Sequence, residues 1–252
     1  MDTGFNGSGK VAVDDGLTGV TQGSQVFALA DGKALVVASH PTTAITVVTR
    51  WNADGTRDDS YGIGGLCQFP GTSPRMLLRP GGAVFVSVHK TTATLGEVRG
   101  CTATGAVDTT IGAAEVGPGV VDFARTPDAG FVFLANTTVG AGAPYAGWIR
   151  TSSSFVLTTY AQTPLAVATT LVLEADGGFL IGGAEGPELK VVRYTSKDKL
   201  DADFGTGGTA SFNVGDIYDA KLMKLVAQPD GRVLAIGKHD NGFDATAVRF
   251  WP

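Results

Sequence analysis

Three histidines have the widest chemical range of the side chains in this sequence. His40, His89 and His239 occupy nearly the same place in three copies of a repeated pattern, eight or nine residues after its turn. Three histidines that converge on one point could hold zinc, at about 2 Å from each nitrogen. These three stand in loops of different repeats, and such loops diverge too far to share one ion. We therefore predict no metal here and interpret the histidines as loop residues that face solvent or a ligand.

Acidic residues in short loops form the second group with chemical potential. They are Asp14, Asp15, Glu115, Asp216 and Asp219. Glycosidases use two carboxyl groups about 5–10 Å apart, one as an acid and the other as a base or nucleophile. Nothing in the sequence sets such a distance. Glycosidase-type catalysis is therefore an alternative, and no residue is assigned as catalytic.

Motifs of several other reactions are missing from the sequence. There is no G-x-S-x-G elbow of a serine hydrolase, and the strings GIGG and GTGG open no helix, as a phosphate loop would. Segment 51–59 is rich in oxygen donors, but an EF-hand loop needs an acidic first residue and a glutamate at the twelfth position. Arg50 and Tyr61 stand at those positions. We predict no cofactor and no calcium site.

The composition is typical of short strands and tight turns. Glycine accounts for 36 of 252 residues, charged residues for 17% and hydrophobic residues for 43%, which excludes disorder and collagen. The net charge of −5 with no Lys/Arg run argues against nucleic acid as a partner. The sequence has no apolar stretch of about 18 residues, so we predict no insertion in a membrane. Its first residues do not match a signal peptide.

A signature of Asp-x-x-aromatic followed by glycines recurs along the chain. It reads DTGFNGSGKV, DDSYGIGGLC and DADFGTGGTA, with weaker copies DTTIG and LTTYA. The copies start near residues 2, 58, 108, 157 and 201, which are 44 to 56 residues apart. A period of this length indicates stacked or radial units that cannot bury their apolar faces alone.

Each repeat also contains an apolar run, a polar turn and a second apolar run. Asp31, Asp128, Asp176 and Asp230 hold the same turn position, and Gly81 holds it in the second copy. An Asp-Gly turn between apolar runs is the strongest local signal for a β-hairpin, because glycine accepts a positive φ.

A strand ending in arginine completes the repeat and precedes the next Asp-x-x-aromatic signature by one turn. Because the arginine and the aspartate lie on adjacent segments, we expect structural ion pairs between them. The expected pairs are Arg50 with Asp58, Arg99 with Asp108, Arg193 with Asp201, and Arg249 with Asp2. Arg150 faces Leu157 in this alignment and needs another acceptor.

These repeats predict a single all-β domain over residues 1–252, a five-bladed β-propeller with four-stranded antiparallel blades. Call the strands A to D from the axis outward. The Asp-Gly hairpin joins A to B, the arginine strand is C, and the Asp-x-x-aromatic segment is D. The last repeat supplies A to C only, whereas residues 2–13 supply a D strand. We expect this segment to pair with residues 244–250 and close the ring, which leaves no open edge.

In a propeller the B–C and D–A loops share one face. The candidate ligand-binding residues on that face are His40, His89, Lys90, Glu185, Lys238, His239, Asp240, Asp14, Asp15, Asp216 and Asp219. The B–C loops differ in length and chemistry while the opposite turns keep one pattern, as expected of a fixed scaffold with one variable face.

The two cysteines, Cys67 and Cys101, are too few for a disulfide scaffold. Cys67 is expected at the end of a D strand and Cys101 after a C strand, near opposite faces about 20 Å apart. Because the Cα atoms of a disulfide lie within about 7 Å of each other, we predict two unpaired thiols.

The motifs resemble the delta-60 repeat, a bacterial β-propeller repeat family of largely unknown function. The matching segments are Asp201–Gly208, Gln228–Gly237 and Arg50–Gly55. The resemblance extends along the whole chain, strongest in the first and fifth repeats. It implies the propeller fold and a secreted, periplasmic or cell-surface location, and it implies no activity.

Recognition is the function that the sequence favours. A rigid propeller would present one polar, asymmetric loop face to a glycan, peptide or protein. The alternatives are a carbohydrate-active enzyme that uses D–A loop carboxylates, and a structural module of a longer surface protein.

Overall fold

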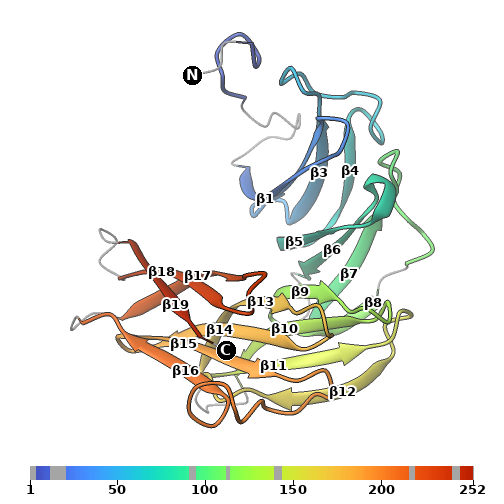
Figure 1. The fold of residues 1–252 in the computed structure, drawn as a ribbon. Helices are drawn as coiled ribbons and strands as arrows, with labels where there is room; N and C mark the ends of the chain where they lie inside the picture. The colour runs from blue at the N-terminus through green and yellow to red at the C-terminus, as the bar shows by residue number, and fades with distance from the viewer. Residues whose placement is uncertain are drawn as a thin grey trace. The chain divides into compact units, whose positions relative to one another are not determined.

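The structure is a computed structural model, and it describes residues 4–11, 21–90, 95–111, 114–138, 144–215, 219–239 and 245–251. The strands of this part of the chain form five antiparallel sheets, and helical structure is confined to one short 3-10 turn, Pro80–Gly82 (Figure 1). The chain divides into two compact units, Met1–Gly117 and Pro118–Pro252. The all-β prediction is confirmed, whereas a single domain over 1–252 stays a prediction.

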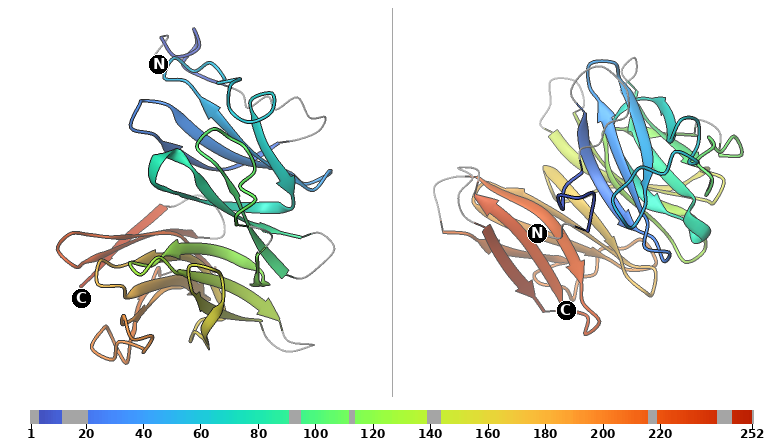
Figure 2. Two further views of the ribbon diagram at one scale, coloured as in Figure 1. Left: turned by 90° about the vertical axis from the view of Figure 1, so that its right-hand side faces the viewer. Right: turned by 90° about the horizontal axis from the view of Figure 1, so that it is seen from above.

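The first unit contains two four-stranded sheets that lie side by side (Figure 2). Sheet 1 is ordered β1(Gln22–Ala28), β2(Ala34–His40), β3(Ile45–Trp51) and β4(Leu66–Pro70). Sheet 2 is ordered β5(Thr72–Leu78), β6(Val84–His89), β7(Leu95–Cys101) and β8(Ala114–Pro118). Their facing sides bury one apolar core, which includes Leu35, Val37, Tyr61, Val86 and Cys101.

The second unit contains three sheets. Sheet 3 is β9(Val120–Arg125), β10(Phe131–Thr138), β11(Pro144–Thr151) and β12(Leu157–Gln162). Sheet 4 is β13(Val167–Leu173), β14(Phe179–Glu185), β15(Glu188–Tyr194) and β16(Thr209–Asn213). Sheet 5 is β17(Ala220–Ala227), β18(Val233–His239) and β19(Ala245–Phe250). Sheet 4 has an apolar core on each face, one shared with sheet 3 and one with sheet 5.

The five predicted hairpins are the first two strands of the five sheets. Their turns need a residue with positive φ, and Gly32 supplies it at φ 80° in the first hairpin. In the third hairpin Ala129 takes the same conformation at φ 67°. The turn geometry is thus kept where the sequence loses the glycine.

The Asp-x-x-aromatic signature is a loop that precedes the fourth strand, rather than the strand itself. Asp58 begins this loop with its amide bonded to the carbonyl of Arg50 at 2.9 Å, and β4 starts only at Leu66. Tyr61 and Phe204, the aromatic residues of two copies, are 0% and 1% exposed. In these two copies the loop therefore buries an aromatic ring before the outer strand. The fourth copy differs, because Leu157–Gln162 is itself strand β12 and Tyr160 is 51% exposed.

The predicted N-terminal strand 2–13 is not a strand where it is described. Residues 4–9 form turns, and the Asn6 amide donates to the carbonyl of Asp54 at 2.6 Å. Sheet 5 has three strands in the described part of the chain, and β19 pairs with β18. Pairing of 2–13 with 244–250 would join the two units, so ring closure stays a prediction.

The first strand of every sheet contains an irregularity near its start. The register shifts at Gly23/Gln25, Thr72/Arg75, Ala168/Thr170 and Leu222/Lys224, and beside Val121 in β9. Such bulges re-aim side chains and increase local twist. In sheets 1, 3 and 4, polar side chains at the bulges reach the next sheet of the same unit.

These side chains bond the backbone of the next sheet. Gln25 Oε1 accepts from the Met76 amide at 2.5 Å in the first unit. In the second unit Asp122 Oδ2 accepts from the Leu171 amide at 2.9 Å, and Thr169 Oγ1 donates to the Leu222 carbonyl at 2.6 Å. The bulges therefore provide a polar link between neighbouring sheets beside the apolar cores.

The prediction of two free thiols is wrong, because Cys67 and Cys101 form a disulfide with Cα atoms 6.3 Å apart. Cys67 lies at the start of β4, not its end, because the preceding signature is a loop. Cys101 is the last residue of β7. Since β4 begins where the third strands end, both cysteines lie at one end of their sheets, and the bond joins sheet 1 to sheet 2.

Removing this disulfide should destabilise the first unit. For the double variant Cys67→Ala/Cys101→Ala we expect a loss of roughly 2–4 kcal/mol in the free energy of unfolding, because the bond closes a loop with a sequence separation of 34 residues. Urea denaturation with and without reductant measures this: reductant should lower the stability of the wild type and leave the variant unchanged. Two reactive thiols in the unfolded, unreduced wild type would contradict the assignment.

Candidate functional site

A polar pocket of about 490 Å³ opens at one end of sheets 1 and 2. We call this the loop-bearing end: it is the end at which β2 ends and β1 and β5 begin, and it carries the B–C and D–A loops that the sequence favours for binding. The start of β1, the end of β2 and the start of β5 form it. Its lining residues are Gln22, Gly23, Ser24, Ser39, Pro41, Thr72, Ser73, Pro74 and Arg75. Pockets that bind small ligands have volumes of about 300–1,000 Å³, so the size suits a small polar group.

Two of the bulged strands shape this pocket. Ser24 Oγ, at the bulge of β1, donates to the carbonyl of Pro74 at 2.7 Å. Arg75 Nη1 donates to Ser24 Oγ and to the Pro74 carbonyl, both at 3.1 Å. Ser73 has a left-handed backbone with φ 50°. These residues were not predicted from the sequence, because a bulge has no sequence signature as clear as an Asp-Gly turn.

The predicted histidines are placed differently from one another. His40 is 1% exposed, and its Nε2 lies 2.9 Å from Thr21 Oγ1. His89, at the end of β6, is half-buried, and this burial lowers its pKa because it disfavours the charged form. The side chain of His239 lies outside the described part. Within that part, no group of three metal-ligating side chains is found.

The other predicted face residues are only partly described. Glu185 accepts from Lys190 Nζ at 2.5 Å, and Lys90 Nζ lies 3.4 Å from the buried carboxylate of Glu97. Lys238 is half-buried and Asp219 exposed. Asp14, Asp15, Asp216 and Asp240 lie outside the described residues, as does the side chain of Glu115. Asp219 is the one D–A loop carboxylate whose side chain the structure describes, so the carboxylate pair of the alternative enzyme stays a prediction.

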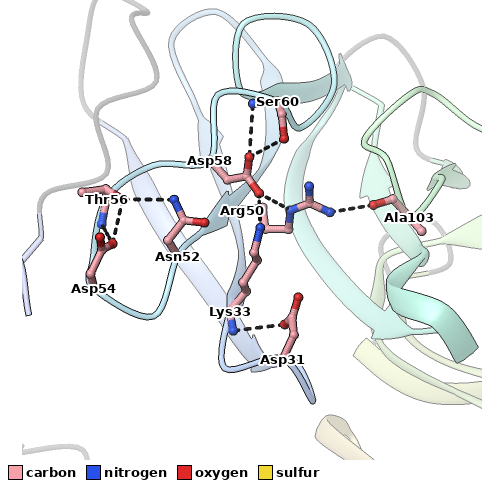
Figure 3. A network of polar contacts seen from close by, with 9 residues as sticks. All are labelled: Asp31, Lys33, Arg50, Asn52, Asp54, Thr56, Asp58, Ser60 and Ala103. Carbon is pink, nitrogen blue, oxygen red and sulfur yellow. Dashed lines mark hydrogen bonds and ion pairs between the residues drawn. The ribbon is translucent and has the colours of Figure 1, made fainter.

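The opposite end of sheet 1 holds a polar network around Asp58 (Figure 3). Asp58 Oδ2 accepts from Arg50 Nε at 2.9 Å and from Lys33 Nζ at 2.7 Å. The other carboxylate oxygen, Oδ1, accepts from Ser60 Oγ at 2.5 Å. These bonds, with Lys33 the largest cause, hold the pKa of Asp58 far below its usual range. The predicted pair of Arg50 and Asp58 is thus present.

Arg50 also links the sheets of the first unit. Its guanidinium lies 4.9 Å from the ring centre of Tyr61, and Nη1 donates to the carbonyl of Ala103 at 2.8 Å, in the turn after β7. Burial raises the pKa of Tyr61 to about 12. The network is framework, because one cation fixes the loop, the aromatic ring and the neighbouring turn.

The predicted pair of Arg99 with Asp108 is absent, because Arg99 is one residue out of register. Gly100 occupies the repeat position of Arg50: the Asp108 amide bonds its carbonyl at 2.8 Å. A shift of one residue points a strand side chain to the other face, where Arg99 Nη2 contacts Glu97 at 2.6 Å. Asp108 is paired instead with Arg79, at 2.6 Å.

The fourth sheet shows the reverse arrangement. Glu174 stands at the repeat position of Arg79, since both amides bond the carbonyl four residues on. It accepts two bonds of 2.9 Å from Arg193. The predicted pair of Arg193 with Asp201 is also present, as a longer contact of 3.6 Å between Nε and Oδ2. In sheets 2 and 4 a turn residue, Arg79 or Glu174, thus supplies one member of an ion pair.

The remaining two arginines of the repeats are Arg150 and Arg249. Arg150 finds the other acceptor that it needs in Asp198, with Nη2 and Oδ1 2.7 Å apart. Asp198 stands at φ 61°, at a turn position that is glycine in the first two repeats. The pair of Arg249 with Asp2 stays a prediction, because Asp2 lies outside the described residues.

Asp58 should make the first unit sensitive to acid. Its folded pKa is depressed, so its contribution is fully present above its unfolded pKa of about 3.9 and is lost as the pH falls toward the folded value. For Asp58→Asn we expect a loss of about 3 kcal/mol at pH 7, with the difference from wild type shrinking below about pH 4.

The matched control is Asp59→Asn. Asp59 pairs with Arg57, but its side chain is 72% exposed, and exposed pairs contribute little. Urea denaturation of both variants across the acid range measures the effect. An Asp58→Asn gap that is independent of pH would contradict the assigned ion pairs.

No family model and no curated protein matches this chain. Solved structures do. A puromycin hydrolase superposes with a TM-score of 0.55 at 15% identity over 86% of this chain and 36% of its own. The Dos1 propeller gives 0.55 at 10% identity over 85% and 53%, and a glucose dehydrogenase gives 0.56 at 11% identity over 91% and 82%.

The chain spans about a third of the puromycin hydrolase and about half of the Dos1 propeller. At these identities the likeness concerns the fold alone. The described part contains no helix long and apolar enough to cross a membrane. The five antiparallel sheets and the propeller neighbour together give this chain a β-propeller scaffold.

Proposed function

We propose that this chain is a non-catalytic recognition module that binds a ligand at the loop-bearing end of its sheets. The observation that carries the proposal is the pocket beside Ser24 and Arg75. Hydroxyl, amide and guanidinium groups surround it, and two prolines add apolar surface. This set supplies hydrogen bonds and one positive charge, as a binding site requires.

The contrast between the two ends of the sheets supports this choice. At one end, arginine pairs of the same kind recur in sheets 1 to 4 and fix the turns, as framework does. At the other end, the lining of the pocket comes from residues that differ between repeats. A fixed scaffold with one variable end is the usual design of a recognition protein.

The disulfide supports a location outside the reducing cytosol. Disulfides persist in secreted, periplasmic and surface proteins, and Cys67–Cys101 joins two sheets in the core of the first unit. We place the protein in such a compartment. The repeat is proposed to be of the delta-60 type, with a glycan, peptide or protein as the ligand class.

We further propose that the five sheets are five blades closed into a ring. The alignment of the repeats predicts which residues would pair at the closure. Val192 pairs with Thr209 in sheet 4, and the same positions relative to the arginine and the aspartate are Val248 and Lys10 in the last and first repeats. The segment that begins at Lys10 would then be the fourth strand of sheet 5, beside β19, and the turns of residues 4–9 would be the loop that precedes it.

Filling the pocket should abolish binding. Gly23 lines the pocket, and a Cβ there would meet nothing within 4 Å, so we expect Gly23→Trp to add bulk at the pocket. We expect a ligand from a glycan and peptide array to bind the wild type and the control Leu157→Trp, whose side chain is 61% exposed in the second unit. The ligand should not bind Gly23→Trp. Equal binding by all three proteins, or chemical turnover of the ligand, would refute the proposal.

Ring closure predicts one specific cross-link. The double variant Lys10→Cys/Val248→Cys should form a second disulfide in air, seen by mass spectrometry of tryptic peptides. Lys10→Cys/Ala247→Cys should not, because a shift of one residue points the side chain to the other face. Equal cross-linking of both variants, or of neither, would count against the proposed register.

A further inference from the structure

Arg75 is held at the pocket by uncharged groups. Its Nη1 donates to the Ser24 hydroxyl and the Pro74 carbonyl, and Ser24 is itself tied to Pro74. These three bonds, of 2.7 to 3.1 Å, fix one terminal nitrogen of the guanidinium. In the described part of the chain, Nε and Nη2 of Arg75 have no hydrogen-bond partner.

The charge of Arg75 is also uncompensated, unlike that of the framework arginines. Among the described residues, no carboxylate forms an ion pair with Arg75. An acidic partner is found for Arg50, Arg57, Arg79, Arg99, Arg150, Arg193 and Arg232. A fixed guanidinium fork without an internal partner matches the geometry of a ligand carboxylate.

The backbone around Arg75 is also specialised. Ser73, a lining residue two positions before it, has φ 50°. Ala44, in the loop before β3, has φ 54°. The Ala44 carbonyl accepts from the Gly71 amide at 2.7 Å, and Thr46 Oγ1 donates to the Gly71 carbonyl at 2.8 Å. Non-glycine residues with positive φ concentrate at ligand sites, where surrounding bonds hold them in place.

The remaining lining favours a sugar. Gln22, Ser39 and Thr72 offer amide and hydroxyl groups, which can both donate and accept, as the hydroxyls of a sugar ring require. Pro41 and Pro74 offer apolar surface for its C–H groups. Resting on the proposed recognition function, we propose that this pocket binds a carboxylate-bearing sugar of an acidic glycan, with the carboxylate on Arg75.

Calorimetry with trigalacturonic acid and with sialyllactose tests the proposal, with the trigalacturonate methyl ester and lactose as neutral partners. We expect wild type to bind at least one acid at least tenfold more tightly than its neutral form. Arg75→Gln should remove this preference, and Arg75→Lys should restore part of it, because lysine keeps the charge without the fork. Added salt should weaken binding of the acid to the wild type.

Gly23→Trp separates this inference from the proposed function. Loss of binding in Gly23→Trp with an unchanged acid preference in Arg75→Gln would keep the pocket and overturn the role of Arg75. Binding of neither acid would overturn the sugar assignment, as would Arg75-dependent binding of the peptide Gly-Asp-Gly alone. Retention of acid binding by Gly23→Trp would overturn the pocket itself.

Discussion

Apolar residues on both faces of one sheet are the constraint on which the rest of this structure depends. In β14, Phe179, Leu180 and Ile181 are consecutive and all are fully buried. Alternate residues of a strand point to opposite faces, so this sheet has two apolar faces and is stable only between two neighbours. Its two cores meet that requirement. Repeats of this kind must stack, and a propeller is the arrangement in which each short sheet gains two neighbours.

Apolar packing sets which sheets meet but leaves their relative position loosely defined, since it is not directional. Polar contacts supply the direction at both ends. At one end the arginine networks tie a loop, a ring and the next turn together, as Arg50 does with Asp58, Tyr61 and Ala103. At the other end the bulges bond the next sheet through Gln25 and Thr169. The two ends differ in how their arginines are paired. The arginines of the networks form ion pairs with carboxylates of the protein, whereas Arg75, beside a bulge, is the residue that we propose to bind a ligand.

The sequence was sufficient for features that depend on local chemistry. Polar turns between apolar runs, three of them Asp-Gly, located the five hairpins, and the spacing of Arg50 and Asp58 located their ion pair. It failed where one residue changed a register. Arg99 looks like the other arginines in the alignment, but Gly100 holds the position, as strand pairing shows. The sequence signal that could have revealed the shift is the spacing of nine residues from Arg99 to Asp108, against eight from Arg50 to Asp58. The disulfide was missed for a related reason: the start of β4 was placed too early by the length of one loop.

The pocket could not be predicted because it depends on two β-bulges, and a bulge has no recognisable sequence signature. Ser24 and Arg75 are 51 residues apart and belong to different sheets. They meet because the extra residues at both bulges turn them toward each other. The framework contacts lie at the opposite end, so a substitution at the bulges changes the chemistry of one surface and leaves those contacts in place. The residue to examine in each repeat is therefore the one beside the bulge, which is Gln25, Arg75, Asp122, Thr170 and Lys224 in the five sheets. Gln25 and Asp122 use their polar atoms to join neighbouring sheets, whereas Arg75 is fixed by its own loop and neighbour and keeps its charge available.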